Sequence, residues 1–281
     1  MTAPAPVGST GRIAAPSTFE DLLAEGASVP VVGWDFSWFT GRATEERPPW
    51  GYASMMGRRM AAVSSALDLQ TGGGEVLATI PQPPPLLVAT EAWPPNLAPA
   101  RENLRLLGAS VVEVAEDADL PFASSCFELV VSRHPVTVTW PEIARVLRPG
   151  GAYLAQHVGA GTLRELTDFM MGPQPVSQRR SAERAVAEAT AAGLDVVDLR
   201  QVRLRTVFDY VAAVVHFLRK VIWIVPGFTV EGYRTRLAAL HDHIGAHGPF
   251  VAHAQRFLIE ARTPEGPRLR PLGAASAVFS L

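Results

Sequence analysis

The sequence predicts an α/β protein with a doubly wound, mainly parallel sheet, and three observations support this fold class. Short apolar strands alternate with helical patterns from Leu67 onward, which is typical of parallel strands covered by helices on both faces. Three consecutive glycines, Gly72–Gly74, follow the first of these strands. The next strand ends in Glu91, 17 residues after Gly74, and an acid at this point of such a sheet contacts the hydroxyls of a ribose.

Composition limits the kind of protein. The chain has 281 residues, of which 48% are hydrophobic and 19% charged, so it is able to bury a large core. Its 25 basic and 27 acidic side chains give a formal net charge of −2, which favours no nucleic-acid partner. The single cysteine, Cys126, excludes an internal disulfide, and no Cys/His spacing indicates a metal site. We therefore expect a cytoplasmic protein without a metal.

The N-terminal part is predicted to precede the sheet. Residues 1–17 contain many Ala, Pro, Gly and Ser and are expected to be mobile. Residues 18–65 are expected to form N-terminal helices and an aromatic segment. That segment, Val31–Tyr52, holds six aromatic residues, Trp34 and Trp38 among them. It is either a lid that excludes water from a ligand or a flap that only packs on the core.

The alternating pattern gives the elements of the predicted core, residues 66–207 and 249–262. The five apolar strands are expected at Leu67–Leu69, Leu86–Thr90, Val111–Val114, Leu129–Ser132 and Ala152–His157. The helices between them are expected at Glu75–Ile80, Asn96–Leu107 and Glu142–Leu147. Right-handed crossovers between parallel strands would bring the carboxyl ends of these strands, and any ligand, to one edge of the sheet.

The C-terminal part is predicted to add a helix, two strands and an insertion. The helix is expected at Ser181–Ala192, and alternating strands are expected at Leu194–Arg205 and Val251–Ala261. Residues 208–248 lie between these strands and read as two helices, which either cap a substrate pocket or pack onto the core. His216, Arg219 and Lys220 interrupt the most apolar stretch, so no membrane span is expected. The tail, residues 263–281, is expected to be loosely ordered.

Several motifs occur together in a fixed order. They are Asp68–Gly74, Glu91, AEDADLPFASSCFELVVSRH (Ala115–His134) and VLRPGGAYLAQHVG (Val146–Gly159), preceded by WDFSWFTGR (Trp34–Arg42). This set resembles class I S-adenosylmethionine-dependent methyltransferases, most closely the type 11 methyltransferase-domain family and a bacterial subgroup of it with unassigned substrates. The resemblance implies a Rossmann-like, seven-stranded sheet with an antiparallel last strand, and the predicted insertion then lies between the last two strands.

The resemblance also implies a cofactor site for S-adenosyl-L-methionine. The residues that correspond to its cofactor contacts are Asp68, Gln70, Thr71, Gly72, Gly73, Gly74, Glu91, Ala92, Glu116, Asp117, Ser132 and Arg133. In the family, the glycine loop holds the methionine part, Glu91 would accept the ribose hydroxyls, and Glu116 and Asp117 would contact the adenine edge. One residue departs from the family, because Gln70 stands where the loop usually has its first glycine. Its side chain would crowd the cofactor or tilt the loop, unless the backbone there is extended.

The candidate catalytic residues are two histidines. His134 and His157 each close a predicted strand at the expected ligand edge, and a histidine suits a general base near neutral pH. A structural role for each is the alternative. Candidate substrate contacts are Trp34, Trp38, Gln156 and Trp223. The expected substrate is a small molecule, aromatic or apolar, that accepts the methyl group on an O or N atom.

Three alternatives remain open. A nicotinamide-dependent oxidoreductase shares the glycine loop and the ribose acid, but its G-x-G-x-x-G spacing is not met here. A catalytically silent binding or assembly protein of the same fold is suggested by Gln70. RNA methylation rests only on Arg200, Arg203 and Arg205, which a solvated strand face explains equally well.

Overall fold

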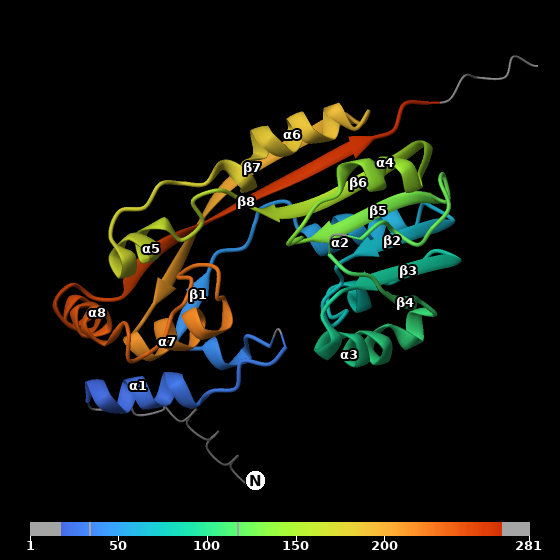
Figure 1. Cartoon of the computed structure of the whole chain (residues 1–281). Coiled ribbons are helices and arrows are strands. Elements are labelled where there is room, and N and C mark those ends of the chain that lie inside the picture. The colour runs from blue at the N-terminus through green and yellow to red at the C-terminus, as the bar shows by residue number, and fades with distance from the viewer. Residues whose placement is uncertain (1–17, 34, 117, 266–281) are drawn as a thin grey trace, which may run out of the picture.

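A computed structural model describes residues 18–33, 35–116 and 118–265 (Figure 1). The N-terminal segment 1–17 and residues 266–281 of the tail, both expected to be loosely ordered, lie outside the described residues. No helix in the described part is long and apolar enough to cross a membrane.

One sheet of eight strands organises the molecule, in the order β1-β7-β8-β6-β5-β2-β3-β4. The strands are β1 (Ala43–Glu45), β2 (Ser65–Leu69), β3 (Leu86–Glu91), β4 (Ser110–Glu113), β5 (Phe127–Arg133), β6 (Leu147–Val158), β7 (Asp195–Phe208) and β8 (Phe250–Arg262). Strands β2 to β6 pair in parallel, whereas β8 runs antiparallel to both β6 and β7. The predicted parallel sheet with an antiparallel last strand is confirmed.

The sheet has one strand more than predicted. Strand β1 lies inside the aromatic segment and pairs antiparallel with β7, with Ala43 opposite Phe208. Its sequence, ATE, has no apolar run that would mark a strand. It is an edge strand whose position is fixed by β7 rather than by its own side chains.

Helices cover both faces of the parallel part of the sheet. The helices are α1 (Phe19–Ser28), α2 (Tyr52–Met60), α3 (Pro94–Leu104), α4 (Trp140–Val146), α5 (Arg164–Met171), α6 (Ala182–Ala191), α7 (Val211–Lys220) and α8 (Arg234–His247). Successive strand residues alternate between the two cores. Leu67, Val130 and Tyr153 pack with α4 and α6, while Ala66 and Leu154 pack with α2. This alternation follows from the period of two along a strand.

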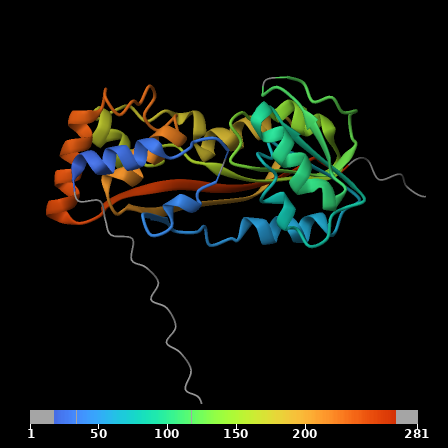
Figure 2. The ribbon, with the colours of Figure 1, turned by 90° about the horizontal axis from the view of Figure 1, so that it is seen from below.

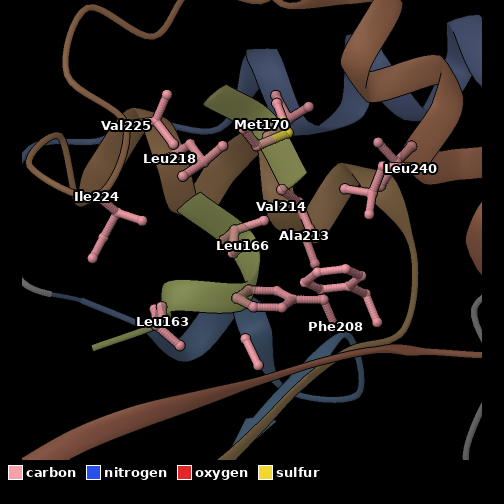
Figure 3. Close-up of a cluster of buried hydrophobic side chains, with 14 of the residues drawn as sticks. Leu163, Leu166, Met170, Phe208, Ala213, Val214, Leu218, Ile224, Val225 and Leu240 are labelled. Carbon is pink, nitrogen blue, oxygen red and sulfur yellow. The ribbon is translucent and has the colours of Figure 1, made fainter. Parts of the chain in front are cut away.

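Strands β7 and β8 extend well beyond the parallel strands of the sheet and carry a helical lobe at their far end (Figures 1 and 2). The lobe contains α1, α5, α7 and α8. Its core includes Leu166 and Met170 of α5, Leu218 of α7 and Leu240 of α8, which converge on Phe208 of β7 (Figure 3). Apolar residues from three segments that are distant in the sequence, α1, α5 and the stretch from β7 to β8, thus form a third core.

The insertion 208–248 packs mainly as part of this lobe. Residues Val211–Val215 and Leu218 of α7 are completely buried, so the apolar face predicted for the insertion is a packing surface. At the tip beyond α7, two large apolar side chains are exposed, Ile222 at 65% and Trp223 at 40%. Of the two interpretations given to the insertion, the buried residues of α7 and α8 fit packing onto the core, and a cap over a substrate pocket stays a prediction.

One predicted helix, Glu75–Ile80, is wrong. The segment forms only a single 3₁₀ turn, Leu77–Thr79. Only six residues separate Gly74 from Pro81, and proline disfavours a helical conformation of the residue before it. Isolated helices of this length are marginal. The glycine loop therefore leads into a turn and not into the N-terminus of a helix.

Helix α1 packs on α7 through Gly26, and this contact gives a test of the lobe. A Cβ atom at Gly26 would lie 2.5 Å from the carbonyl oxygen of Ala212 and 2.8 Å from Cβ of Val215. We expect Gly26→Ala to destabilise the protein by about 2 kcal/mol in urea unfolding, because overpacking of this size costs about 1–3 kcal/mol. In an open helix the same change would stabilise by up to about 1 kcal/mol, so an increase in stability would contradict this packing.

Candidate functional site

The glycine loop lies at the carboxyl end of β2. Gln70, Gly72 and Gly74 all have left-handed backbone conformations, with φ of 57°, 65° and 80°. Thr71 donates its backbone N–H to the carbonyl of Thr90 over 2.9 Å, which ties the loop to β3. Gly74 has no room for a side chain, because a Cβ atom would lie 2.9 Å from Cγ of Leu104. Backbone conformation therefore favours glycine at positions 72 and 74, and close packing also favours it at position 74.

Gln70 has a left-handed backbone conformation, and its side chain is held by two hydrogen bonds. Its Nε2 donates to the carbonyl of Thr137 over 2.6 Å, and its Oε1 accepts from the N–H of Val136 over 2.7 Å. The side chain thereby bridges the loop after β2 and the segment after β5. The alternative of an extended backbone at Gln70 is wrong, since φ is 57°.

The bridge made by Gln70 predicts the effect of removing it. Gln70→Gly removes the cost of a left-handed non-glycine residue, about 1–2 kcal/mol of stability. It also deletes two hydrogen bonds, each of which contributes about 1 kcal/mol. We expect little change in global stability and faster hydrogen exchange at the Val136 amide. Gln70→Asn tolerates the same φ but is too short to bridge, so it should show the same faster exchange. Unchanged protection of Val136 in both variants would show that the bridge does not hold this segment.

Glu91 ends β3 and is 6% exposed. Its Oε2 accepts from the N–H of Gly72 over 2.7 Å, and its Oε1 accepts from the N–H groups of Ala92 and Trp93 over 3.1 and 2.8 Å. A carboxylate has about four acceptor positions, so about one remains for a ligand. The acid therefore fixes the glycine loop against β3 in addition to any contact with a ligand.

Asp68 lies directly below the loop in β2 and is also buried, at 6% exposure. The pKa of Asp68 is raised to about 7, mainly by burial; the hydroxyl of Thr71 acts against this rise, and the nearby charge of Glu91 adds to it. A group with this pKa is partly protonated near neutral pH. Beside it, the hydroxyl of Thr71 is buried.

A pocket opens at the same edge of the sheet, between the ends of β2, β3, β4 and β5. It is lined by Leu69, Gln70, Thr90, Val114, Ala115, Glu116, Ala118, Leu120, Ser132, Pro135, Thr137, Val138, Thr139, Glu142, Ile143 and Tyr153. Three of the predicted cofactor residues, Gln70, Glu116 and Ser132, thus share one pocket. The hydroxyl of Ser132 donates to the carbonyl of Leu69 over 2.9 Å, and it is completely buried. Asp117 lies outside the described residues.

Glu142 shapes this pocket and was not predicted from the sequence. Its Oε2 accepts from the N–H of Leu120 over 2.7 Å, and its carboxylate is paired with Arg145, which also donates to the carbonyls of Leu120 and Phe122. The Leu-Pro-Phe stretch is therefore held by an acid and an arginine from α4. The sequence shows Glu142 and Arg145 as an acid and a base three residues apart in a predicted helix. This spacing does not show that they bind the loop at Leu120–Phe122.

His134 and Gln156 meet at the carboxyl ends of β5 and β6. The Nε2 atoms of the two side chains are 2.8 Å apart, and the Oε1 of Gln156 accepts from the indole N–H of Trp50 over 2.8 Å. Trp50 is buried, and sequence reasoning did not include it among the site residues. His134 also has a left-handed backbone, with φ of 59°. Burial and the charges of Arg133, Arg256 and Arg180 hold the pKa of His134 well below its usual range.

His157 lies on the other face of the sheet from Gln156. Its ring stacks on Phe257 with centroids 4.6 Å apart, and its Nε2 is 3.2 Å from the hydroxyl of Tyr153. Burial, with the charge of Arg180, lowers the pKa of His157 to about 3. The structure places this histidine in the core formed with α4 and α6, beside Trp140 and Phe257, and its catalytic role stays a prediction.

The predicted substrate tryptophans lie apart from one another. Trp38 packs against His216 of α7, with centroids 4.8 Å apart, and below the guanidinium of Arg42. Lys220 of α7 donates to the carbonyl of Gly33 over 2.7 Å, so the aromatic segment is fastened to the helical lobe. Trp223 stands at the exposed tip after α7, with the guanidinium of Arg180 over its ring. Trp34 lies outside the described residues.

The fold and the site together define a class of protein. A doubly wound sheet with an antiparallel last strand, a glycine loop after the first core strand and an acid at the end of the next make up the Rossmann-like fold of class I methyltransferases. Residues 67–155 match the family described as a methyltransferase domain, of type 11. The resemblance inferred from the motifs is confirmed.

Solved structures support the fold assignment. The protein YcgJ of Bacillus subtilis has a TM-score of 0.55 at 16% identity, covering 76% of this chain and 99% of that protein. A protein of Bacillus halodurans C-125, assigned as a methyltransferase, has a TM-score of 0.52 at 18% identity, covering 75% and 98%. A Deinococcus radiodurans R1 protein of unknown function has a TM-score of 0.52 at 17% identity, covering 79% and 90%. No curated protein matches the sequence. At these identities the similarity establishes the fold alone.

Proposed function

We propose that this protein transfers a methyl group from S-adenosyl-L-methionine to an O or N atom of a small molecule. The observation that carries the proposal is the pairing of Glu91 with the glycine loop at the carboxyl edge of a methyltransferase domain. This edge is where doubly wound sheets bind nucleotides.

The residues present fit the chemistry of this cofactor. Gly72 and Gly73 present backbone without side chains, and Glu91 keeps about one acceptor position for a ribose hydroxyl. Glu116 and Ser132 line the adjoining pocket. When bound, the cofactor supplies a methyl group on a positively charged sulfur.

The protein's own contribution would be to hold and desolvate the two reactants. Trp50 and Tyr52 are buried beside β5 and β6, and the hydroxyl of Tyr52 donates to the carbonyl of Ser132 over 2.9 Å. These rings exclude water from the ends of the two strands. Alignment and desolvation supply much of the acceleration in reactions of this type.

A silent scaffold of the same fold is the second candidate, and specific observations favour it. Three of the acceptor positions of Glu91 are filled by backbone N–H groups, and the glycine loop does not lead into a helix N-terminus. The RNA alternative has less support, because Arg200 and Arg203 are paired with Asp198 and Glu165.

Turnover separates the two candidates. The protein is incubated with S-adenosylmethionine and a panel of small acids, phenols and amines, and formation of S-adenosylhomocysteine is measured. Methyl transfer to at least one panel member, absent without protein, is the expected result. Binding of the cofactor without turnover on a broad panel would favour the silent scaffold, and methylation of RNA but of no small molecule would contradict the proposed substrate class.

A further inference from the structure

A second cavity lies at the amino edge of the sheet, opposite the edge that carries the glycine loop. The pocket beside the glycine loop is lined by Ser132, near the end of β5, whereas this cavity is lined by Glu128, near the beginning of β5. Its volume is about 390 Å³, which is within the range of cavities that hold small molecules. Its walls come from the end of α2, the beginnings of β5 and β6 and the end of β8.

Three arginines line this cavity. They are Arg59 of α2, Arg148 of β6 and Arg262 of β8, so three segments that are distant in the sequence bring them together. Their side chains are 39%, 45% and 48% exposed, and a ligand in the cavity can therefore reach them. Among the described residues that line the cavity, Glu128 is the only acid, while Glu265 stands near Gly150 outside this lining.

The ion pairs of these arginines leave one positive charge unbalanced. Arg59 and Arg262 share the carboxylate of Glu260, which is buried, and each of its oxygens contacts one guanidinium. Arg148 is paired with Glu128 over 2.7 Å, and the other oxygen of Glu128 accepts a backbone N–H over 2.7 Å. Three guanidinium groups are thus paired with two carboxylates, whose oxygens are all engaged.

The same arginines keep hydrogen-bond donors for a ligand. A guanidinium has five N–H donors, and the described contacts of each of these arginines use one terminal nitrogen. A phosphate group carries three strong acceptor oxygens and nearly two negative charges, so it suits several guanidinium groups better than a single carboxylate does. Val63 and Leu129 add an apolar part to the wall, which suits the carbon skeleton of a ligand.

We propose that the cavity at the amino edge binds a small molecule that carries a phosphate group. Arg59, Arg148 and Arg262 hold the phosphate oxygens through N–H groups that their ion pairs leave unused, and the apolar part of the wall contacts the rest of the molecule. This site lies at the opposite edge of the sheet from the proposed cofactor site, and it does not depend on the proposed function.

The first test uses phenyl phosphate as the probe and benzoate for comparison, in buffers of equal ionic strength. Backbone amide resonances of the unaltered protein are followed by NMR during each titration. Phenyl phosphate should shift the amides of Gly150, Gly151 and Ala152 at millimolar concentration and leave those of Gly72 and Glu91 unchanged. Benzoate should bind at least about tenfold more weakly. Equal affinity for benzoate, shifts confined to the glycine loop, or no shifts would overturn the proposal.

The second test compares two neighbouring kinds of arginine. Arg148→Gln should weaken phenyl phosphate binding at least about tenfold, whereas Arg58→Gln, at an exposed arginine of α2 outside the cavity, should not change it. Arg148→Gln should stay folded, because its partner Glu128 is 32% exposed and keeps contact with water. Arg148→Lys keeps the charge but loses the planar fork, so an intermediate affinity is expected. Unchanged affinity in Arg148→Gln, or an equal loss in Arg58→Gln, would overturn the proposal.

Discussion

Glu91→Ala is expected to destabilise the ligand-free protein by about 3 kcal/mol or more. The substitution removes the acceptor of three backbone N–H groups in a buried site, and each such group costs about 1–3 kcal/mol when it is left unpaired. On the folded fraction, affinity for S-adenosylhomocysteine should also fall at least about tenfold. Urea unfolding and calorimetric titration measure the two effects.

Two further variants make the Glu91 result specific. Glu91→Gln keeps an oxygen for Ala92 and Trp93 but turns an N–H₂ group toward the N–H of Gly72, so an intermediate loss is expected. Glu102→Ala, at an exposed acid of α3, should change neither stability nor affinity appreciably. Stability of Glu91→Ala equal to that of Glu102→Ala would show that Glu91 does not hold the glycine loop.

The free energy of unfolding is expected to fall as pH rises from about 4 to about 7, because of Asp68. Burial raises the folded-state pKa of Asp68 to about 7, whereas its unfolded value is about 3.9. Between these values the folded state binds a proton that the unfolded state has lost, so stability decreases with pH through this window. The full contribution is about 4 kcal/mol, since one pKa unit corresponds to about 1.4 kcal/mol.

Asp68→Asn tests this directly. The variant cannot ionise, so relative to the unaltered protein it should be more stable above pH 7 and similar near pH 4. Urea unfolding at several pH values measures the difference. Asp198→Asn, at an acid of the β7 surface paired with Arg200, serves as the control and should not gain stability at high pH. A difference between Asp68→Asn and the unaltered protein that does not vary with pH would contradict a raised pKa at Asp68.

Local patterns were sufficient to predict most of the sheet. Strands such as β3 and β5 contain short continuous apolar runs, which are typical of parallel strands covered on both faces. The sequence predicted a helix in place of the 3₁₀ turn at Leu77–Thr79, because the glycine run suggested a helix start. Pro81 disfavours a helical conformation of the residue before it and so limits the segment to one turn. Strand β1 could not be predicted, because its pairing with β7 is a long-range contact.

The candidate site was predicted in part, for similar reasons. Gln156 and His157 are neighbours in β6, so their side chains face opposite sides of the sheet. The sequence does not show which of the two side chains points toward the ligand. Trp50 could not be assigned, because its partner Gln156 is 106 residues away. The role of Gln70 depends on Val136 and Thr137, which belong to a different loop.

Calorimetric titration of the unaltered protein with S-adenosylhomocysteine tests the central claim most directly. We expect one site per chain, and a stabilisation of about 2.7 kcal/mol when the ligand is present at 100 times its Kd. Nicotinamide adenine dinucleotide, measured in parallel, should give neither binding heat nor stabilisation. Folded protein that binds no S-adenosylhomocysteine would contradict the account, because the glycine loop and Glu91 would then form a structural joint without a cofactor.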